Sequence, residues 1–158
     1  MLFLLFQIGK DRYALEASRV VEVVPLLTLK ELPQAPKGFV GIFNYRGSPV
    51  PALDLCQLTL GTPSRERLST RIVIVNHPDG RGATHLLGLI AEHATDVIRK
   101  DPKEFVDPGV RIGGAAYLGP VLMDRHGPIQ WVHEQRLLPE PVRNVLFAKT
   151  PTALHEAN

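Results

Sequence analysis

The sequence predicts an all-β protein, and its dense short strands favour two small barrels of about five strands each. Short runs of apolar and β-branched residues recur along the 158-residue chain. The 13 glycines and 14 prolines interrupt these runs at short intervals and supply the turns between them. Sequence patterns alone leave the order of the strands in the sheets open.

The N-terminal part of the chain contains three predicted strands. The run Met1–Phe6 is apolar but lacks the features of a secretory signal, so we expect a buried strand in a cytosolic protein. The predicted strands are Leu2–Ile8, Arg12–Leu15 after a tight turn at Gly9-Lys10-Asp11, and Val20–Val24, which ends at Pro25. Strict alternation along the third strand would place Val21 and Val23 on one face and Val20, Glu22 and Val24 on the other.

A hairpin with an arginine at its turn follows the proline-containing connector "LPQAPKGFVGI". Its predicted strands, Ile42–Tyr45 and Val50–Leu53, are joined by Arg46-Gly47-Ser48. Pro49 and Pro51 mark the second strand as an edge strand, because proline cannot donate to a central ladder.

The segments after the hairpin repeat the strand pattern, and only the end of the chain looks helical. Asp54 is expected to cap one helical turn at Leu55–Leu60. The polar stretch "GTPSRERLST", residues 61–70, is the best candidate for a boundary between two halves. The remaining predicted segments are a strand at Arg71–Asn76, a turn over 77–84, a strand pair within 85–100 bent near Glu92–Ala94, a loop over 101–115, a hairpin over 116–133, helical stretches at Glu134–Leu138 and Val142–Ala148, and a flexible tail over 149–158.

Composition argues against several classes of function. Apolar residues make up 44% of the chain, and the net charge is only +2 with scattered basic residues, which is a weak electrostatic footprint for nucleic acid. The single cysteine, Cys56, excludes an intramolecular disulfide framework and a multi-cysteine zinc site. A small-barrel module for single-stranded nucleic acid is the second hypothesis, with Tyr45 and Arg46 as its best stacking pair.

No motif in the sequence indicates catalysis, a metal or a cofactor. Cys56 lies in an apolar run that would raise its pKa and weaken it as a nucleophile. No nucleophile elbow, paired carboxylates or phosphate loop is present, so an unrecognised hydrolase is only a distant third hypothesis. The histidines are too dispersed for a metal site and are expected at turns or on the surface: residues 77, 85, 93, 126, 133 and 155.

Two charged residues stand out in otherwise apolar strands. Glu22 lies at the centre of one predicted strand and Arg46 at the end of another. They are either separate solvated charges or a pair that shapes the mouth of a groove through a charge-assisted hydrogen bond. Such a groove would take an apolar partner element, with the ion pair setting its register.

These segments together resemble the CheW-like adaptor family of bacterial chemosensory systems over nearly the whole chain. The most specific part is "LPQAPKGFVGIFNYRGSPVPALDL", supported by "FQIGKDRYAL", "VVEVVP", "RIVIVN", "LLGLIAEHATDVI" and "EQRLL". The resemblance implies a single domain over residues 1–148, built from two intertwined SH3-like five-stranded barrels with a short C-terminal helix. The subdomain boundary is expected near 61–70, with the chain termini crossing between subdomains.

The resemblance also implies a function without catalysis. Such adaptors link the cytoplasmic hairpin tip of a chemoreceptor to the regulatory domain of a CheA-type histidine kinase. They are cytoplasmic and reach membrane receptor arrays through these partners, without binding nucleic acid or inserting into the membrane.

The resemblance assigns roles to individual residues of a groove that binds these partners. Glu22 and Arg46 match a charged pair beside the groove, and Gly47 matches a turn glycine with positive φ. The apolar positions that line or support it are Val20, Val23 and Ile42, together with Leu87, Leu89 and Ile90 on a strand assigned to the second subdomain.

Three departures from the family pattern predict a specialised adaptor. Ala91-Glu92-His93-Ala94 replaces a Val-Asp-x-Val pattern, and Tyr45 replaces a more usual leucine. The sequence also begins at its first strand, so contacts through an N-terminal extension are not expected. The hypothesis is one dedicated receptor–kinase pair, in surface motility or second-messenger control rather than swimming.

Overall fold

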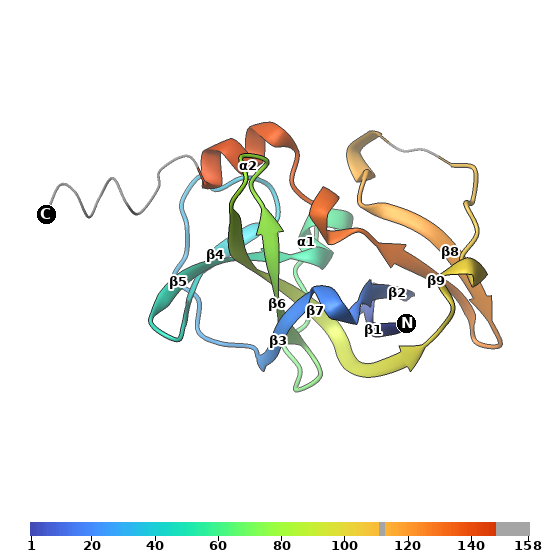
Figure 1. The fold of residues 1–158 in the computed structure, drawn as a ribbon. Helices are drawn as coiled ribbons and strands as arrows, with labels where there is room; N and C mark the ends of the chain where they lie inside the picture. The colour runs from blue at the N-terminus through green and yellow to red at the C-terminus, as the bar shows by residue number, and fades with distance from the viewer. Residues whose placement is uncertain (111–112, 148–158) are drawn as a thin grey trace, which may run out of the picture.

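The computed structural model describes residues 1–110 and 113–147, and β-strands form most of its body (Figure 1). The predicted tail over 149–158 lies outside the described residues, as does Ala148 at the end of the predicted C-terminal helix. The strands are β1 (Leu2–Ile8), β2 (Asp11–Glu16), β3 (Val20–Pro25), β4 (Phe39–Tyr45), β5 (Ser48–Asp54), β6 (Arg71–Pro78), β7 (Thr84–Arg99), β8 (Leu118–Asp124) and β9 (Gly127–Val132).

The helices are short and connect or cover the strands. Asp54 caps α1 as expected, because its carboxylate accepts hydrogen bonds from the N–H groups of Cys56 and Gln57. The predicted stretch Glu134–Leu138 is helical only as a single 3-10 turn. The helices are α1 (Leu55–Leu60), α2 (Glu140–Leu146) and the 3-10 turns η1 (Ala17–Arg19), η2 (Pro102–Glu104), η3 (Gly113–Ala115) and η4 (Glu134–Arg136).

The strands form two five-stranded barrels that share β7, which confirms the predicted fold class. The first barrel has the order β3-β6-β7-β5-β4, and the second has the order β7-β1-β2-β9-β8. Each barrel contains one parallel pair, β5 with β7 in the first and β2 with β9 in the second. In Figure 1 the two barrels lie side by side.

A two-way backbone bridge closes each ring of strands. In the first barrel Lys30, which follows β3, exchanges two N–H···O bonds of 2.8 Å with Ile42 on β4. In the second barrel Val106, which follows β7, does the same with Val121 on β8. A Cβ at Gly41 would lie 2.6 Å from the Lys30 carbonyl oxygen, so the first closure requires glycine there.

Strand β7 passes from one barrel into the other through a sharp bend. Its first half pairs with β5 and β6, and its second half pairs with β1. His93 at the bend has a φ of 51°, and the pairing with β1 jumps from Asp96 to Glu92 at this point. The predicted bend near Glu92–Ala94 is therefore present, but one continuous strand replaces the predicted strand pair.

The division between the barrels does not fall near residues 61–70, where the sequence predicted a boundary. That segment joins α1 to β6, and its flanking strands β5 and β6 both belong to the first barrel. The N-terminal strands β1 and β2 instead pair with the second half of β7 and with β9. The first and last strands of the described chain thus belong to the same barrel, so no single division of the sequence separates the two barrels.

Within the described residues, three clusters of buried side chains form the core. One lies in the first barrel around Phe43, Ile72 and Ile74, and one lies in the second barrel around Phe3, Phe105 and Ile129. The largest cluster includes residues of both barrels, such as Leu4 on β1 and Leu89 on β7. Val142 and Leu146 of α2 pack against it. Most strand aromatics are therefore committed to packing and are not available as stacking platforms.

Candidate functional site

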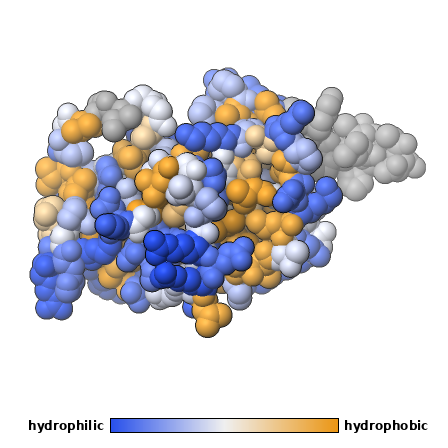
Figure 2. Space-filling model, turned by 180° about the vertical axis from the view of Figure 1, so that it is seen from behind, coloured by the Kyte–Doolittle hydropathy of each residue, from blue (hydrophilic) through white to orange (hydrophobic). Residues whose placement is uncertain are grey.

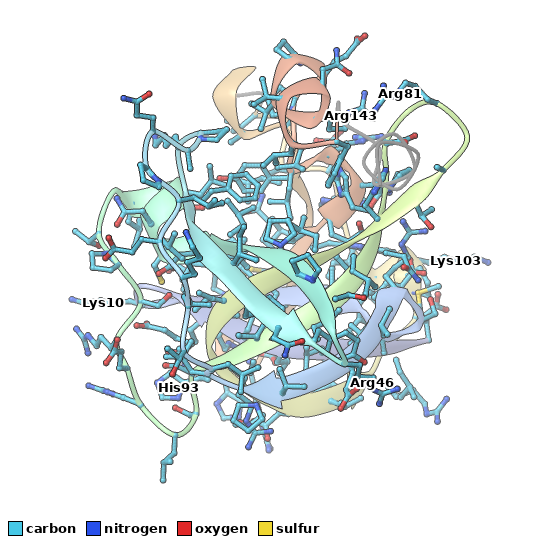
Figure 3. All side chains as sticks on the ribbon, turned by 90° about the vertical axis from the view of Figure 1, so that its left-hand side faces the viewer. Lys10, Arg46, Arg81, His93, Lys103 and Arg143 are labelled. Atoms are coloured by element: carbon cyan, nitrogen blue, oxygen red, sulfur yellow. The ribbon has the colours of Figure 1, made fainter. Side chains whose placement is uncertain are left out.

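Three side chains from β3 and the β4–β5 hairpin meet at the surface of the first barrel. The Tyr45 hydroxyl donates to Glu22 Oε1 over 2.5 Å, and Arg46 Nη2 donates to the same oxygen over 3.0 Å. The guanidinium carbon of Arg46 lies 5.2 Å from the centre of the Tyr45 ring. We call these three residues the Glu22–Tyr45–Arg46 cluster; Figure 3 shows Arg46 at the tip of the hairpin.

The turn of the hairpin places Arg46 by its backbone conformation. Tyr45 pairs with Ser48, so the loop consists of Arg46 and Gly47 alone rather than the predicted three residues. Their φ angles are 51° and 86°, and positive φ at both central residues is what a type I′ turn requires. The Asn44 side chain accepts a 2.8 Å hydrogen bond from the Gly47 N–H and holds the turn. Gly47 thus has the positive φ that was expected.

A β-bulge in β3 places Glu22. Val20 pairs with Val75 and Glu22 pairs with Ile74, so Val21 is an extra residue in the ladder, 45% exposed. The bulge corrects the predicted alternation, because Val20 and Val23 now pack against the same core cluster. The sequence pattern could not reveal this, since a bulge leaves no signature in a run of valines.

The prolines of β5 lie where the strand has only one neighbour. Pro49 and Pro51 are opposite Asn44 and Ile42 on β4, whereas pairing with β7 begins only at Ala52. This arrangement agrees with the edge-strand interpretation, since no ladder on the open side needs a proline N–H.

The predicted groove residues fall into accessible and buried groups. Arg46 and Gly47 are exposed, and Glu22, Val20, Val23 and Ile42 are partly buried. Leu87, Leu89 and Ile90 are at most 3% exposed, on the part of β7 that belongs to the first barrel rather than the second. These three residues support the fold from inside and do not reach a partner in this conformation, which corrects their assignment to a cleft-facing strand.

Two exposed apolar side chains belong to β3 and the residues that follow it. Val21 on β3 and Leu27 just after it are 45% and 38% exposed. The face opposite to that of Figure 1 shows apolar regions beside a strongly hydrophilic patch (Figure 2). Val21, which precedes Glu22 on β3, thus places an exposed apolar side chain next to the charged pair.

The departure at Glu92 has a structural role. The Glu92 carboxylate is buried and accepts a 2.5 Å hydrogen bond from the Arg65 N–H. Two residues further along β7, the Ala94 N–H donates to the Ser69 carbonyl oxygen. Asp54 holds the same connector through the N–H and hydroxyl of Ser64. Residues 61–70 are therefore fastened to the bend of β7.

A buried polar cluster, which sequence analysis missed, joins β6 to the turns η1 and η4. His77 is fully buried rather than at a surface turn, and burial with nearby Arg143 and Arg19 lowers its pKa to about 4. Its Nδ1 lies 3.9 Å from Glu134 Oε2, and burial raises the pKa of that carboxyl. Arg19 donates to the other oxygen of Glu134.

The rest of the chain offers little for catalysis. Burial raises the pKa of the Cys56 thiol, which keeps it protonated and unreactive. Within residues 1–110 and 113–147 no group of three or more His, Cys, Asp or Glu side chains is arranged to hold a metal ion. None of the helices in the described ranges has the length and apolar character needed to cross a bilayer.

Comparison with known proteins places the chain in a family. The family described as "CheW-like domain" matches residues 2–141. The chain belongs to the CheW-like family. Because this family is non-enzymatic, the match confirms that the chain is not an enzyme.

Two individual proteins illustrate the similarity to other CheW-like chains. "Chemotaxis protein CheW" from Helicobacter pylori (strain ATCC 700392 / 26695) is 29% identical over 98 residues, which cover 61% of this chain and 56% of that relative. The match therefore spans little more than half of the relative. The crystal structure of scaffolding protein TtCheW from Thermoanaerobacter tengcongensis has a TM-score of 0.74 at 23% identity, over 87% of each chain, and this likeness shows the shared fold.

Proposed function

We propose that this CheW-like chain is an adaptor that links the cytoplasmic hairpin tip of a chemoreceptor to the regulatory domain of a CheA-type histidine kinase. It would work in the cytoplasm and reach membrane receptor arrays through these partners. The observation that carries the proposal is the Glu22–Tyr45–Arg46 cluster, a charged pair beside exposed apolar side chains. The relatives support it, since one is called a chemotaxis protein and another a scaffolding protein.

The chemistry of this surface suits a helical partner. Exposed Val21 and half-buried Val23 and Ile42 offer apolar contacts to the face of a helix. Arg46 and Glu22 carry opposite charges at a defined place, which sets the register of a bound segment and contributes to its affinity.

The departures from the family pattern support a dedicated partner pair. Tyr45 enters the charged cluster directly, and Glu92 holds the connector 61–70 against β7. Tyr45 acts at the hairpin tip, and Glu92 acts at the bend of β7. We therefore assign the adaptor to a specialised pathway, such as surface motility or second-messenger control, rather than swimming.

The proposal is tested by measuring binding of the receptor tip and of the kinase regulatory domain from the same organism. We expect dissociation constants of about tens of micromolar or tighter, the range of transient signalling contacts. Arg46→Glu and Glu22→Arg should each weaken receptor binding about tenfold, and the double reversal should recover part of the loss. Arg67→Glu reverses an exposed arginine on the 61–70 connector and serves as the matched control.

The outcome that contradicts the proposal is a folded chain that binds neither partner in this range. Salt-sensitive binding to single-stranded nucleic acid in the same experiments would favour the alternative module instead.

A further inference from the structure

The carboxylate of Glu22 receives both of its hydrogen bonds on one oxygen. Tyr45 and Arg46 donate to Oε1 over 2.5 Å and 3.0 Å. Among the described residues, no hydrogen bond reaches Oε2. The two donors therefore share one acceptor atom, and each of them influences the orientation of the carboxylate.

Tyr45 is the more firmly anchored of the two donors. The side chain of Arg46 is 75% exposed and that of Glu22 39%, and an ion pair this open to solvent contributes little alone. The Tyr45 ring packs against the core of the first barrel, which restricts its motion. Its hydroxyl makes the shorter, charge-assisted bond, and this bond raises the pKa of the Tyr45 phenol.

Arg46 keeps most of its donors free. A guanidinium has five N–H groups in a planar fork, and only Nη2 donates within the described residues. The type I′ turn fixes the backbone of Arg46, and its guanidinium lies 5.2 Å from the centre of the Tyr45 ring. The fork is thus held in place at the hairpin tip with capacity for a second, bidentate acceptor.

We propose that Tyr45 is a positioning residue that sets the specificity of this surface. By holding Glu22, its hydroxyl keeps the carboxylate from turning to occupy both Nη groups of Arg46. The free face of the guanidinium then binds a carboxylate on an otherwise apolar helix of the partner. The identity of the partner in this inference rests on the proposed function, whereas the role of Tyr45 in holding Glu22 is independent of it.

The test compares Tyr45→Phe with the unaltered chain against two probes. One probe is the purified cytoplasmic hairpin tip of a chemoreceptor from the same organism, and the other is the same tip with its exposed acidic residues changed to amides. We expect the unaltered chain to bind the acidic tip about tenfold more tightly than the amide form, as charge-assisted hydrogen bonds predict. Tyr45→Phe should lose most of this preference, because the Glu22 carboxylate is then free to pair with both Nη groups of Arg46.

Two controls separate positioning from a general structural effect. Glu22→Gln removes the competing charge, so adding Tyr45→Phe to it should cause no further loss of preference. Tyr117→Phe removes a hydroxyl that bonds Thr59 over 2.9 Å away from the cluster, and it should leave the preference unchanged.

A measurement on the free chain decides the role of Tyr45 when the tip does not bind. Three-bond couplings report the χ1 angle of Glu22, which should populate one rotamer in the unaltered chain and several in Tyr45→Phe. An unchanged rotamer in Tyr45→Phe overturns the positioning role. Failure of the unaltered chain to bind the tip, with the rotamer change present, overturns the proposed partner instead.

Discussion

Burial sets the charge state of the ionisable side chains that join the C-terminal part of the chain to the first barrel. His77 on β6 and Glu134 in η4 are both fully enclosed, and η1 contributes Arg19 to the same site. Since a charge in a dry interior is disfavoured, the fold holds His77 neutral and favours the protonated form of Glu134. These residues make the interior sensitive to acid, unlike the solvated Glu22–Tyr45–Arg46 cluster.

His77 predicts a loss of stability in mild acid. Its pKa is about 4 in the fold against an ordinary value of 6.5, so between these pH values the unfolded chain binds more protons. The free energy of unfolding should therefore fall as pH drops from 6.5 to 4, by up to about 3 kcal/mol for this shift. Glu134 opposes part of this fall, because its raised pKa favours the protonated fold at low pH.

Urea unfolding at stepped pH values measures this effect. His77→Phe should reduce the dependence between pH 6.5 and 4 and leave the part due to His133, whose pKa burial also lowers. His126→Gln, which replaces an exposed histidine in the β8–β9 turn, controls for the loss of a histidine as such. The lowered pKa values of Asp79 and Asp124, both about 2, act mainly around and below the ordinary value of 3.8, so they add to the dependence only at the acid edge of this window. An equally steep dependence in His77→Phe would show that other groups carry it.

The pairing of Glu22 with Arg46 was predictable at the residue scale, but its geometry was not. The resemblance placed both charges beside one groove, and the structure brings them to 3.0 Å. The hydrogen bond of Tyr45 to Glu22 was not predictable, although Tyr45 departs from the family pattern, because it depends on a type I′ turn and on the bulge at Val21. Both are local backbone features that the alternation of apolar residues does not encode.

At the scale of elements, Asp54 connects β5, α1 and the 61–70 connector. Its carboxylate caps α1 and also accepts from the N–H and hydroxyl of Ser64, over 2.9 Å and 2.6 Å. The residue is 4% exposed, so water cannot replace these bonds when the carboxylate is removed. The sequence predicted the cap but not the connector contact, which links residues ten positions apart.

Asp54→Ala should lower the free energy of unfolding by about 3 kcal/mol, which combines a lost cap with buried donors left unpaired. Asp101→Ala is the matched control, since Asp101 caps the 3-10 turn η2 at an exposed position. We expect about 1 kcal/mol or less there. Chemical denaturation of both variants measures the difference; equal losses would mean that the connector contacts of Asp54 contribute nothing.

At the scale of the whole molecule, the two barrels are interlocked rather than linked end to end. β7 contributes to both rings, and β1 and β2 join β8 and β9 across the length of the chain. Arg12 on β2 also bonds Asp124 at the β8–β9 turn, over 2.5 Å. The barrel count was predictable from strand density, and the resemblance implied that the barrels are intertwined. The boundary near 61–70 was wrong, because strand pairing between distant segments leaves no local pattern in the sequence.

This interlocking predicts that both barrels unfold in a single step. Ile129 on β9 and Ile72 on β6 are both 0% exposed, one in the core of the second barrel and one in that of the first. Ile129→Val and Ile72→Val should each lower the free energy of unfolding by about 1 kcal/mol. β7 is a strand of both barrels, so unfolding of one barrel removes a strand from the other. Each substitution should therefore destabilise both barrels.

Amide hydrogen exchange at amides that exchange only through global unfolding reports the stability of each barrel separately. The probes are the amides of Ile74 on β6 and Leu122 on β8, which belong to different barrels. In each variant the protection of both amides should fall by the same factor, about fivefold for 1 kcal/mol. If Ile129→Val lowers protection at Leu122 and leaves Ile74 unchanged, the barrels unfold independently. The bend at His93 would then be a hinge between separable units, and partner binding to one barrel would have no reason to stabilise the other.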